Sequence, residues 1–183
     1  MLFRSLGYNA IPSSNDTASN IPLAIDAGLG EASRSSKLCH PVYGTCCRIS
    51  KVITDMPLIP DTPIEFGVHD FCKICKRCAE KCPAKAISTA EDVSNTPCGD
   101  FSPSHVTQWQ VDHAKCRKIW VKSGTNCGIC IAVCPLNQKN TISHRFRKST
   151  AAKWPEMDRH IMKSMLKAGG GQTHKPEDFW KNL

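Results

Sequence analysis

The sequence lacks the long apolar runs and the leader segments that mark membrane-spanning or exported chains. No stretch of its 183 residues approaches the ~18 apolar residues of a membrane-spanning helix. The N-terminus has neither adjacent arginines nor a basic start followed by an apolar segment, so we expect no export signal in this chain. Charged residues make up only 22% and apolar residues 40%, which argues against a wholly disordered chain.

The basic charge of the chain is unevenly distributed. The formal net charge is +8, with −1 in residues 1–65, +3 in residues 66–138 and +6 in residues 139–183. A basic tail can bind nucleic acid or an anionic membrane surface. The basic residues here are scattered and lack the interleaved aromatic residues of a nucleic-acid platform. We therefore expect a solvated surface and no nucleic-acid partner.

Cysteine, in contrast, is abundant. Twelve of 183 residues are cysteine, which is below the ~8–10% of short secreted disulfide scaffolds but far above the content of a typical cytosolic enzyme. A chain of this length can bury a core without disulfides, so the cysteines need another role. Eight lie in the middle third: Cys72, Cys75, Cys78, Cys82, Cys116, Cys127, Cys130 and Cys134. Four lie outside that pattern: Cys39, Cys46, Cys47 and Cys98.

The eight cysteines form two related runs. The first, from Cys72 to Pro83, reads C-x-x-C-x-x-C-x-x-x-C-P, the pattern with which bacterial ferredoxins bind [4Fe–4S] clusters. The first three thiolates can wrap a loop around one face of a cluster, while the fourth faces a second cluster. The last three cysteines and the proline recur 52 residues later, from Cys127 to Pro135. The second run begins at Cys116, before a ten-residue insertion.

The ligand exchange typical of two-cluster ferredoxins predicts which cysteines share a cluster. The first cluster would take Cys72, Cys75, Cys78 and Cys134, and the second Cys82, Cys116, Cys127 and Cys130. Zinc and disulfides are the alternatives, but zinc sites pair two short knuckles and do not need the x-x-x-C-P continuation. We therefore favour two [4Fe–4S] clusters. The crossed ligation ties the two halves together, so that loss of one cluster should loosen both.

The flanking segments predict a mixed α+β chain. Residues 48–54 alternate in part between polar and apolar side chains and contain β-branched residues, which indicates a strand. Pro57, Pro60 and Pro63 prevent regular structure and predict a connecting segment. A helix is predicted over residues 155–168, after a basic connection.

Several flanking motifs resemble the corrinoid- and iron–sulfur-dependent reductive dehalogenases. They are A-G-L-G-E-A-S-R at residues 27–34, I-T-D-M-P-L at residues 53–58 and W-Q-V-D at residues 109–112, before Cys116. The resemblance covers nearly the whole chain. Epoxyqueuosine reductase, a related enzyme, shares the G-L-G turn and the double cluster but matches these flanks less well.

This resemblance implies a partial nitroreductase-like corrinoid-binding α/β unit at residues 1–65. A two-cluster ferredoxin-like module at residues 66–138 and a C-terminal helical extension at residues 139–183 would follow. Electrons would pass through the clusters to a corrinoid (cobalamin) cobalt that cleaves carbon–halogen bonds. The partners implied are an organohalide substrate and a small membrane-anchor subunit or another electron donor. The family is exported and membrane-associated on the outer face of the cytoplasmic membrane. An epoxyqueuosine reductase-like enzyme and a stand-alone ferredoxin-type electron carrier remain alternatives.

The resemblance also assigns roles outside the cysteines. The turn near the corrinoid would be formed by Gly28, Leu29, Gly30 and Arg34; an ordinary turn with a surface arginine is the alternative. Arg48 is the candidate for the basic residue that assists proton donation at the halogen site, although an arginine flanking a strand in the core is the simpler alternative. Asn15 is a weaker candidate for the pocket. The four additional cysteines are expected to be free thiols.

The family members are much longer than this chain, and their proton-donating tyrosine would lie upstream of residue 1. Tyr8 and Tyr43, the two tyrosines present, do not match its surroundings. The family's D-x-H-x-x-G motif for a histidine lower ligand is not expected, and the sequence does not contain it. We therefore expect a C-terminal fragment that binds clusters and has little dehalogenase activity by itself.

Overall fold

The computed structural model describes residues 2–99, 101–102 and 106–137, a part of the chain that includes all twelve cysteines. The predicted helix at 155–168 and the extension at 139–183 lie outside these residues. The elements are α1 (Leu2–Ser5), β1 (Ala10–Ser13), α2 (Asn20–Asp26), β2 (Glu31–Ala32), β3 (Leu38–Cys39), β4 (Lys51–Thr54), α3 (Val68–Cys75), α4 (Arg77–Glu80), α5 (His113–Ser123), α6 (Ile129–Ala132) and a 3₁₀ turn at Pro135–Asn137. The mixture of helices and strands confirms the predicted α+β class. None of the described helices is long and apolar enough to span a membrane.

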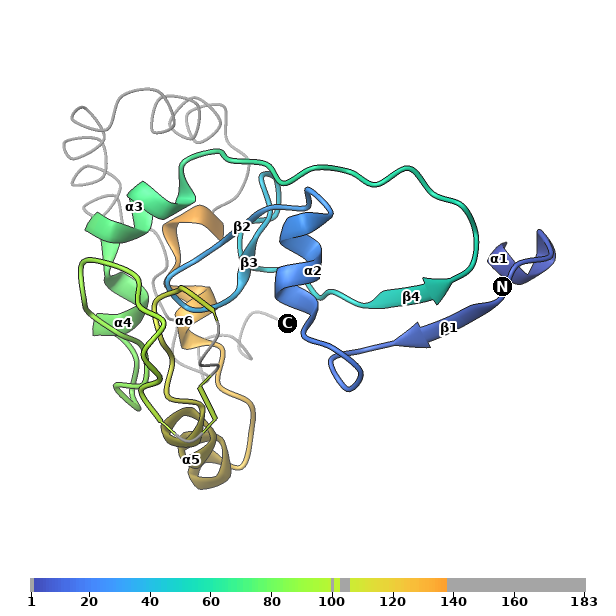
Figure 1. Ribbon diagram of the computed structural model, residues 1–183. Helices are drawn as coiled ribbons and strands as arrows, with labels where there is room; N and C mark the ends of the chain where they lie inside the picture. Colours follow the sequence, from blue (N-terminus) through green and yellow to red (C-terminus); the bar gives the residue numbers. More distant parts are fainter. Residues whose placement is uncertain (1, 100, 103–105, 138–183) are drawn as a thin grey trace, which may run out of the picture.

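The first sheet joins β1 and β4 in antiparallel register, with Ala10 opposite Thr54 and Ser13 opposite Lys51. The strand predicted at 48–54 is thus present in its second half. In Figure 1 this two-stranded ribbon lies to one side, with α2 between it and the cysteine-bearing helices α3, α4 and α6. Residues 55–67 contain no helix or strand, as their prolines predict, and they arc back from β4 to α3 (Figure 1).

The second sheet pairs β2 with β3 and brings the A-G-L-G-E-A-S-R segment against the rest of the chain. Glu31 lies opposite Cys39 and Ala32 opposite Leu38. Gly28 has a φ of +65°, and a Cβ atom there would lie 2.6 Å from the carbonyl oxygen of Thr62. A Cβ atom at Gly30 would collide with the carbonyl of Cys39. The chain's own close backbone contacts therefore require glycine at both positions.

The core is built around the cysteines. One group of buried residues comprises Cys39, Val68, Phe71, Cys72, Trp109 and Leu136. A second comprises Ala79, Cys82, Ala86, Ile87 and Val111. Partly buried cysteines pack against each group: Cys75 and Cys134 against the first, and Cys78, Cys116 and Cys130 against the second. The residues that would surround iron–sulfur clusters are therefore also those that pack this half of the molecule.

Candidate iron–sulfur and cofactor sites

One cavity collects cysteines from both sequence runs. Helix α3 carries Cys72 and Cys75, and Cys78 follows in α4 after Lys76, whose φ of 44° makes the turn between the helices. The cavity is lined by Cys72, Cys75, Cys78, Cys130 and Cys134, together with Arg34 and its serine neighbours. Its volume is small, about 20 Å³. Cys130 and Cys134 thus lie beside the first run although they belong to the second.

Cys82, Cys116, Cys127 and Cys130 form a second group, of which Cys130 also lines the first cavity. Negative charge on Cys82 and Cys127 would raise the pKa of both Cys116 and Cys130, although burial is the larger cause for each thiol. Cys116 lies on α5, and Cys130 lies on α6, which packs against α4. Lys37 opposes the rise of the pKa at both thiols. The second group therefore has its own nearby cation.

Burial keeps the thiols of the first group protonated when nothing is bound to them. It raises the pKa of Cys75 to about 11 and of Cys78 to about 12, and it raises the pKa of Cys72 further. Four converging thiols can become thiolates together only if a strongly positive group enters and protons leave. This donor set fits an iron–sulfur cluster, whose irons supply that charge.

Backbone N–H groups point at cysteine sulfurs in both groups. The N–H of Arg34 donates to Cys72 Sγ at 3.5 Å, and that of Ala86 donates to Cys82 Sγ at 3.4 Å. Backbone N–H groups of Leu136 and Asn137 hold down the pKa of Cys134 in part, against the effect of burial. Such N–H···S contacts favour the thiolate form, and they tune the potential of a bound cluster.

Two residues of the A-G-L-G-E-A-S-R segment hold the two ends of α3. The carboxylate of Glu31 accepts hydrogen bonds from the N–H groups of Phe66, Val68 and His69 at the start of the helix. At the other end, Arg34 Nε donates to the carbonyl of Cys72 at 2.9 Å. A carboxylate at the N-terminus and a cation at the C-terminus both match the helix dipole. The helix that carries two candidate ligands is thereby fixed from outside the cysteine run.

All twelve cysteines are without disulfides. Across residues 2–99, 101–102 and 106–137, no three histidine, cysteine or acidic side chains are arranged to hold a single metal ion. Of the four cysteines outside the two runs, Cys39 is buried, Cys47 is half-buried, and Cys46 and Cys98 are exposed.

A separate cavity of about 420 Å³ unites the two candidate pocket residues. Asn15 and Arg48 both line it, and Lys37 and Ile131 form another part of its wall. Ile131 lies between Cys130 and Cys134, so the cavity adjoins the second cysteine run. Arg48 is exposed, not part of the core.

The four residues of the predicted corrinoid turn have different environments in the structure. Gly28 and Gly30 serve the backbone contacts described above, and Leu29 is 43% exposed. Arg34 is buried, and its guanidinium donates to carbonyls of the chain itself. A corrinoid contact by the Gly28–Gly30 turn stays a prediction, whereas the guanidinium donors of Arg34 are taken up by the backbone carbonyls of Cys72, Ser88 and Ala90.

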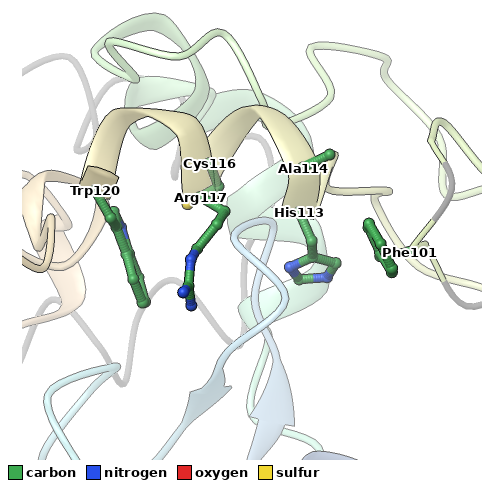
Figure 2. A pocket seen from close by; sticks show the side chains of 6 residues that line it. All are labelled: Phe101, His113, Ala114, Cys116, Arg117 and Trp120. Carbon is green, nitrogen blue, oxygen red and sulfur yellow. The ribbon is translucent and has the colours of Figure 1, made fainter. Parts of the chain in front are cut away.

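A third cavity, of about 460 Å³, lies along α5 and was not anticipated from the sequence. Figure 2 shows His113, Arg117 and Trp120 pointing from one side of α5 into it, with Phe101 beyond His113. These three helix residues are spaced i, i+4 and i+7, which is the signal that could have indicated a shared face. Cys116 forms part of the wall, so the cavity adjoins the second cysteine group.

The fold and the two cysteine groups define a ferredoxin-type module for two clusters. Residues 71–137 match the family model of the 4Fe-4S double cluster binding domain. The prediction of a double [4Fe–4S] module is therefore confirmed.

The chain is 44% identical over 141 residues to a tetrachloroethene reductive dehalogenase of Sulfurospirillum multivorans, covering 77% of this chain and 28% of that protein. It also resembles a solved reductive dehalogenase described in terms of B12-dependent dehalogenation, with a TM-score of 0.77 and 34% identity over 92% of this chain and 24% of that one. The epoxyqueuosine reductase of Cyclobacterium marinum is 27% identical over 168 residues, which are 87% of this chain and 52% of that protein. The chain belongs to the reductive dehalogenase family, a family of oxidoreductases, as its flanking motifs predict. It spans about a quarter of the length of the dehalogenases it matches.

Proposed function

We propose that this chain is the part of a reductive dehalogenase that holds two [4Fe–4S] clusters beside a corrinoid and conducts electrons between them. The first cluster would be held by Cys72, Cys75, Cys78 and Cys134. The second would be held by Cys82, Cys116, Cys127 and Cys130. The proposal rests on the position of Cys134, which lines the cavity of the first run and whose negative charge would raise the pKa of Cys72 and Cys75. Cys130 also lines this cavity, but the pKa values of Cys130 and Cys116 both respond to charge on Cys82 and Cys127.

The cavity lined by Asn15 and Arg48 is the proposed contact of this chain with the corrinoid and the organohalide. A corrinoid would supply a reducible cobalt, in a nitroreductase-like α/β unit to which residues 1–65 contribute. Arg48 offers an exposed cation that can hold an acidic proton donor or a departing halide in place. Lys37 and Ile131 line this cavity, and Lys37 also acts on the pKa values of Cys116 and Cys130, so the cavity adjoins the second cysteine group.

Anaerobic reconstitution with iron and sulfide tests the proposal. We expect about eight irons and eight acid-labile sulfides per chain, since each cluster contains four of each. Stoichiometric zinc without sulfide would contradict it. Retention of cobalamin after anaerobic refolding tests the corrinoid contact, and a chain that loads both clusters yet retains no cobalamin would be an electron carrier. We expect little halide release from these 183 residues alone.

A further inference from the structure

Arg34 is a buried cation that donates its hydrogen bonds to backbone carbonyls. Its exposed fraction is 1%, and charged side chains are rarely buried unless they are paired. In the described part of the chain, no acidic side chain forms an ion pair with it. Its acceptors are backbone carbonyls instead: those of Cys72 at 2.9 Å, Ser88 at 2.9 Å and Ala90 at 2.7 Å.

The groups that can balance this charge are the cysteines of the first site. Arg34 lines their cavity, and negative charge on Cys72, Cys78 and Cys75 would raise the pKa of its guanidinium against the opposing effect of burial. A [4Fe–4S]²⁺ core with four thiolates carries a net charge of about −2. A bound first cluster would therefore be a counter-ion that the described residues do not otherwise supply at this position.

The position of the guanidinium is fixed by three separate segments. It lies 4.5 Å from the centre of the Trp109 ring, and it connects the carbonyls at the end of α3 with those of Ser88 and Ala90. A lysine would keep the positive charge at this position but would make fewer of these contacts, because its three donors radiate from a single nitrogen. Arg34 is therefore held rigidly beside the cavity and shielded from water.

We propose that Arg34 positions the first cluster loop and raises the reduction potential of the first cluster. This inference rests on the proposed ligation. In the step concerned, one electron from a low-potential donor reduces [4Fe–4S]²⁺ to [4Fe–4S]⁺, and no bond or proton is exchanged. The added negative charge lies beside a fixed positive charge in a region of low dielectric constant, so the reduced form is stabilised. The second cluster has Lys37 nearby instead, which is only half-buried.

Redox titration of the reconstituted full chain, followed by electron paramagnetic resonance, tests this inference. The variants are Arg34→Gln and Arg34→Lys, and Lys73→Gln is the matched control. Lys73 follows Cys72 directly, but its side chain is 41% exposed and pairs with Asp92. For Arg34→Gln we expect the ratio of reduced to oxidised first cluster at a fixed potential to fall about tenfold, or about 59 mV. Lys73→Gln should change it less than about twofold, because water and salt screen the charge.

The outcomes separate this inference from the proposed function. A wild-type chain that binds no iron and sulfide refutes the proposed function. If both clusters load and Arg34→Gln shifts the potential no more than Lys73→Gln does, only the role of Arg34 is refuted. If Arg34→Gln fails to load the first cluster, Arg34→Lys decides: iron content and potential close to wild type support the role of the charge, and loss of either refutes it.

Discussion

The crossed arrangement of ligands can be tested by combining cysteine substitutions in pairs. Cys134 lines the cavity that also contains Cys72, whereas Cys116 lies in the other group. Replacing Cys72 and Cys134 together by serine should therefore remove two ligands from one site and leave the other site complete. Replacing Cys116 and Cys134 together should damage both sites. From about eight irons per chain, the first pair should retain about four and the second pair close to none.

The assay is iron and acid-labile sulfide after reconstitution with excess iron and sulfide, which compensates for weaker binding of the remaining cluster. Cys98→Ser combined with Cys134→Ser serves as the control, since Cys98 is exposed and lies outside both groups; it should retain about four irons. If each run instead held its own cluster, the Cys72 and Cys134 pair would lose nearly all iron, and the Cys116 and Cys134 pair would retain about four irons. If the Cys116 and Cys134 pair retained about four irons while the Cys72 and Cys134 pair lost all, the proposed ligation would be refuted.

Three further perturbations test the supports of the sites. Glu31→Ala leaves three N–H groups at the start of α3 without their acceptor and should cost about 2–4 kcal/mol in urea unfolding, whereas the exposed Glu65→Ala should cost almost nothing. Gly44→Ala places a Cβ atom against the carbonyl of Leu136 at a φ of +61°. It should destabilise the chain by about 2 kcal/mol and lower the iron content after reconstitution. An unchanged iron content together with an unchanged free energy of unfolding would disprove this packing. The backbone N–H of Lys115 lowers the pKa of Asp112, which caps α5, so this carboxylate stabilises the fold above pH ~3.9. The difference in unfolding free energy between Asp112→Asn and wild type should therefore shrink as the pH falls below that value. A difference that does not change with pH would count against the cap.

The cysteine spacing was sufficient to predict the double-cluster module, because ligand geometry constrains neighbouring residues in the sequence. The prolines after β4 likewise predicted residues 55–67, since their effect on the backbone is local. Helix α5 was not predicted. It has no buried residues, so its sequence has no apolar stripe to reveal it. Its helical structure comes from the Asp112 cap at one end and Gly124, with a φ of 68°, at the other.

The burial of Arg34 could not be read from the sequence for a different reason. Its acceptors at Cys72, Ser88 and Ala90 lie 38, 54 and 56 residues away. Nothing in the neighbouring glycines and serines indicates those distant carbonyls. Arg34, which the family resemblance places near the corrinoid, therefore supports the first cysteine site in the fold.

The contacts of Glu31 and Arg34 with α3 have a consequence for exchanging modules between proteins. A graft cut at residue 66 would carry all eight candidate ligands but would leave behind the acid and the base that hold both ends of their first helix. Such a graft would contain the complete ferredoxin motif, yet its first cluster loop would lack the hydrogen bonds that Glu31 and Arg34 make to α3. Chimeras in which the transplanted segment begins before Ala27 keep that support. Residues 27–34 therefore belong structurally with the helix that carries Cys72 and Cys75, although the sequence predicts a boundary between residues 65 and 66.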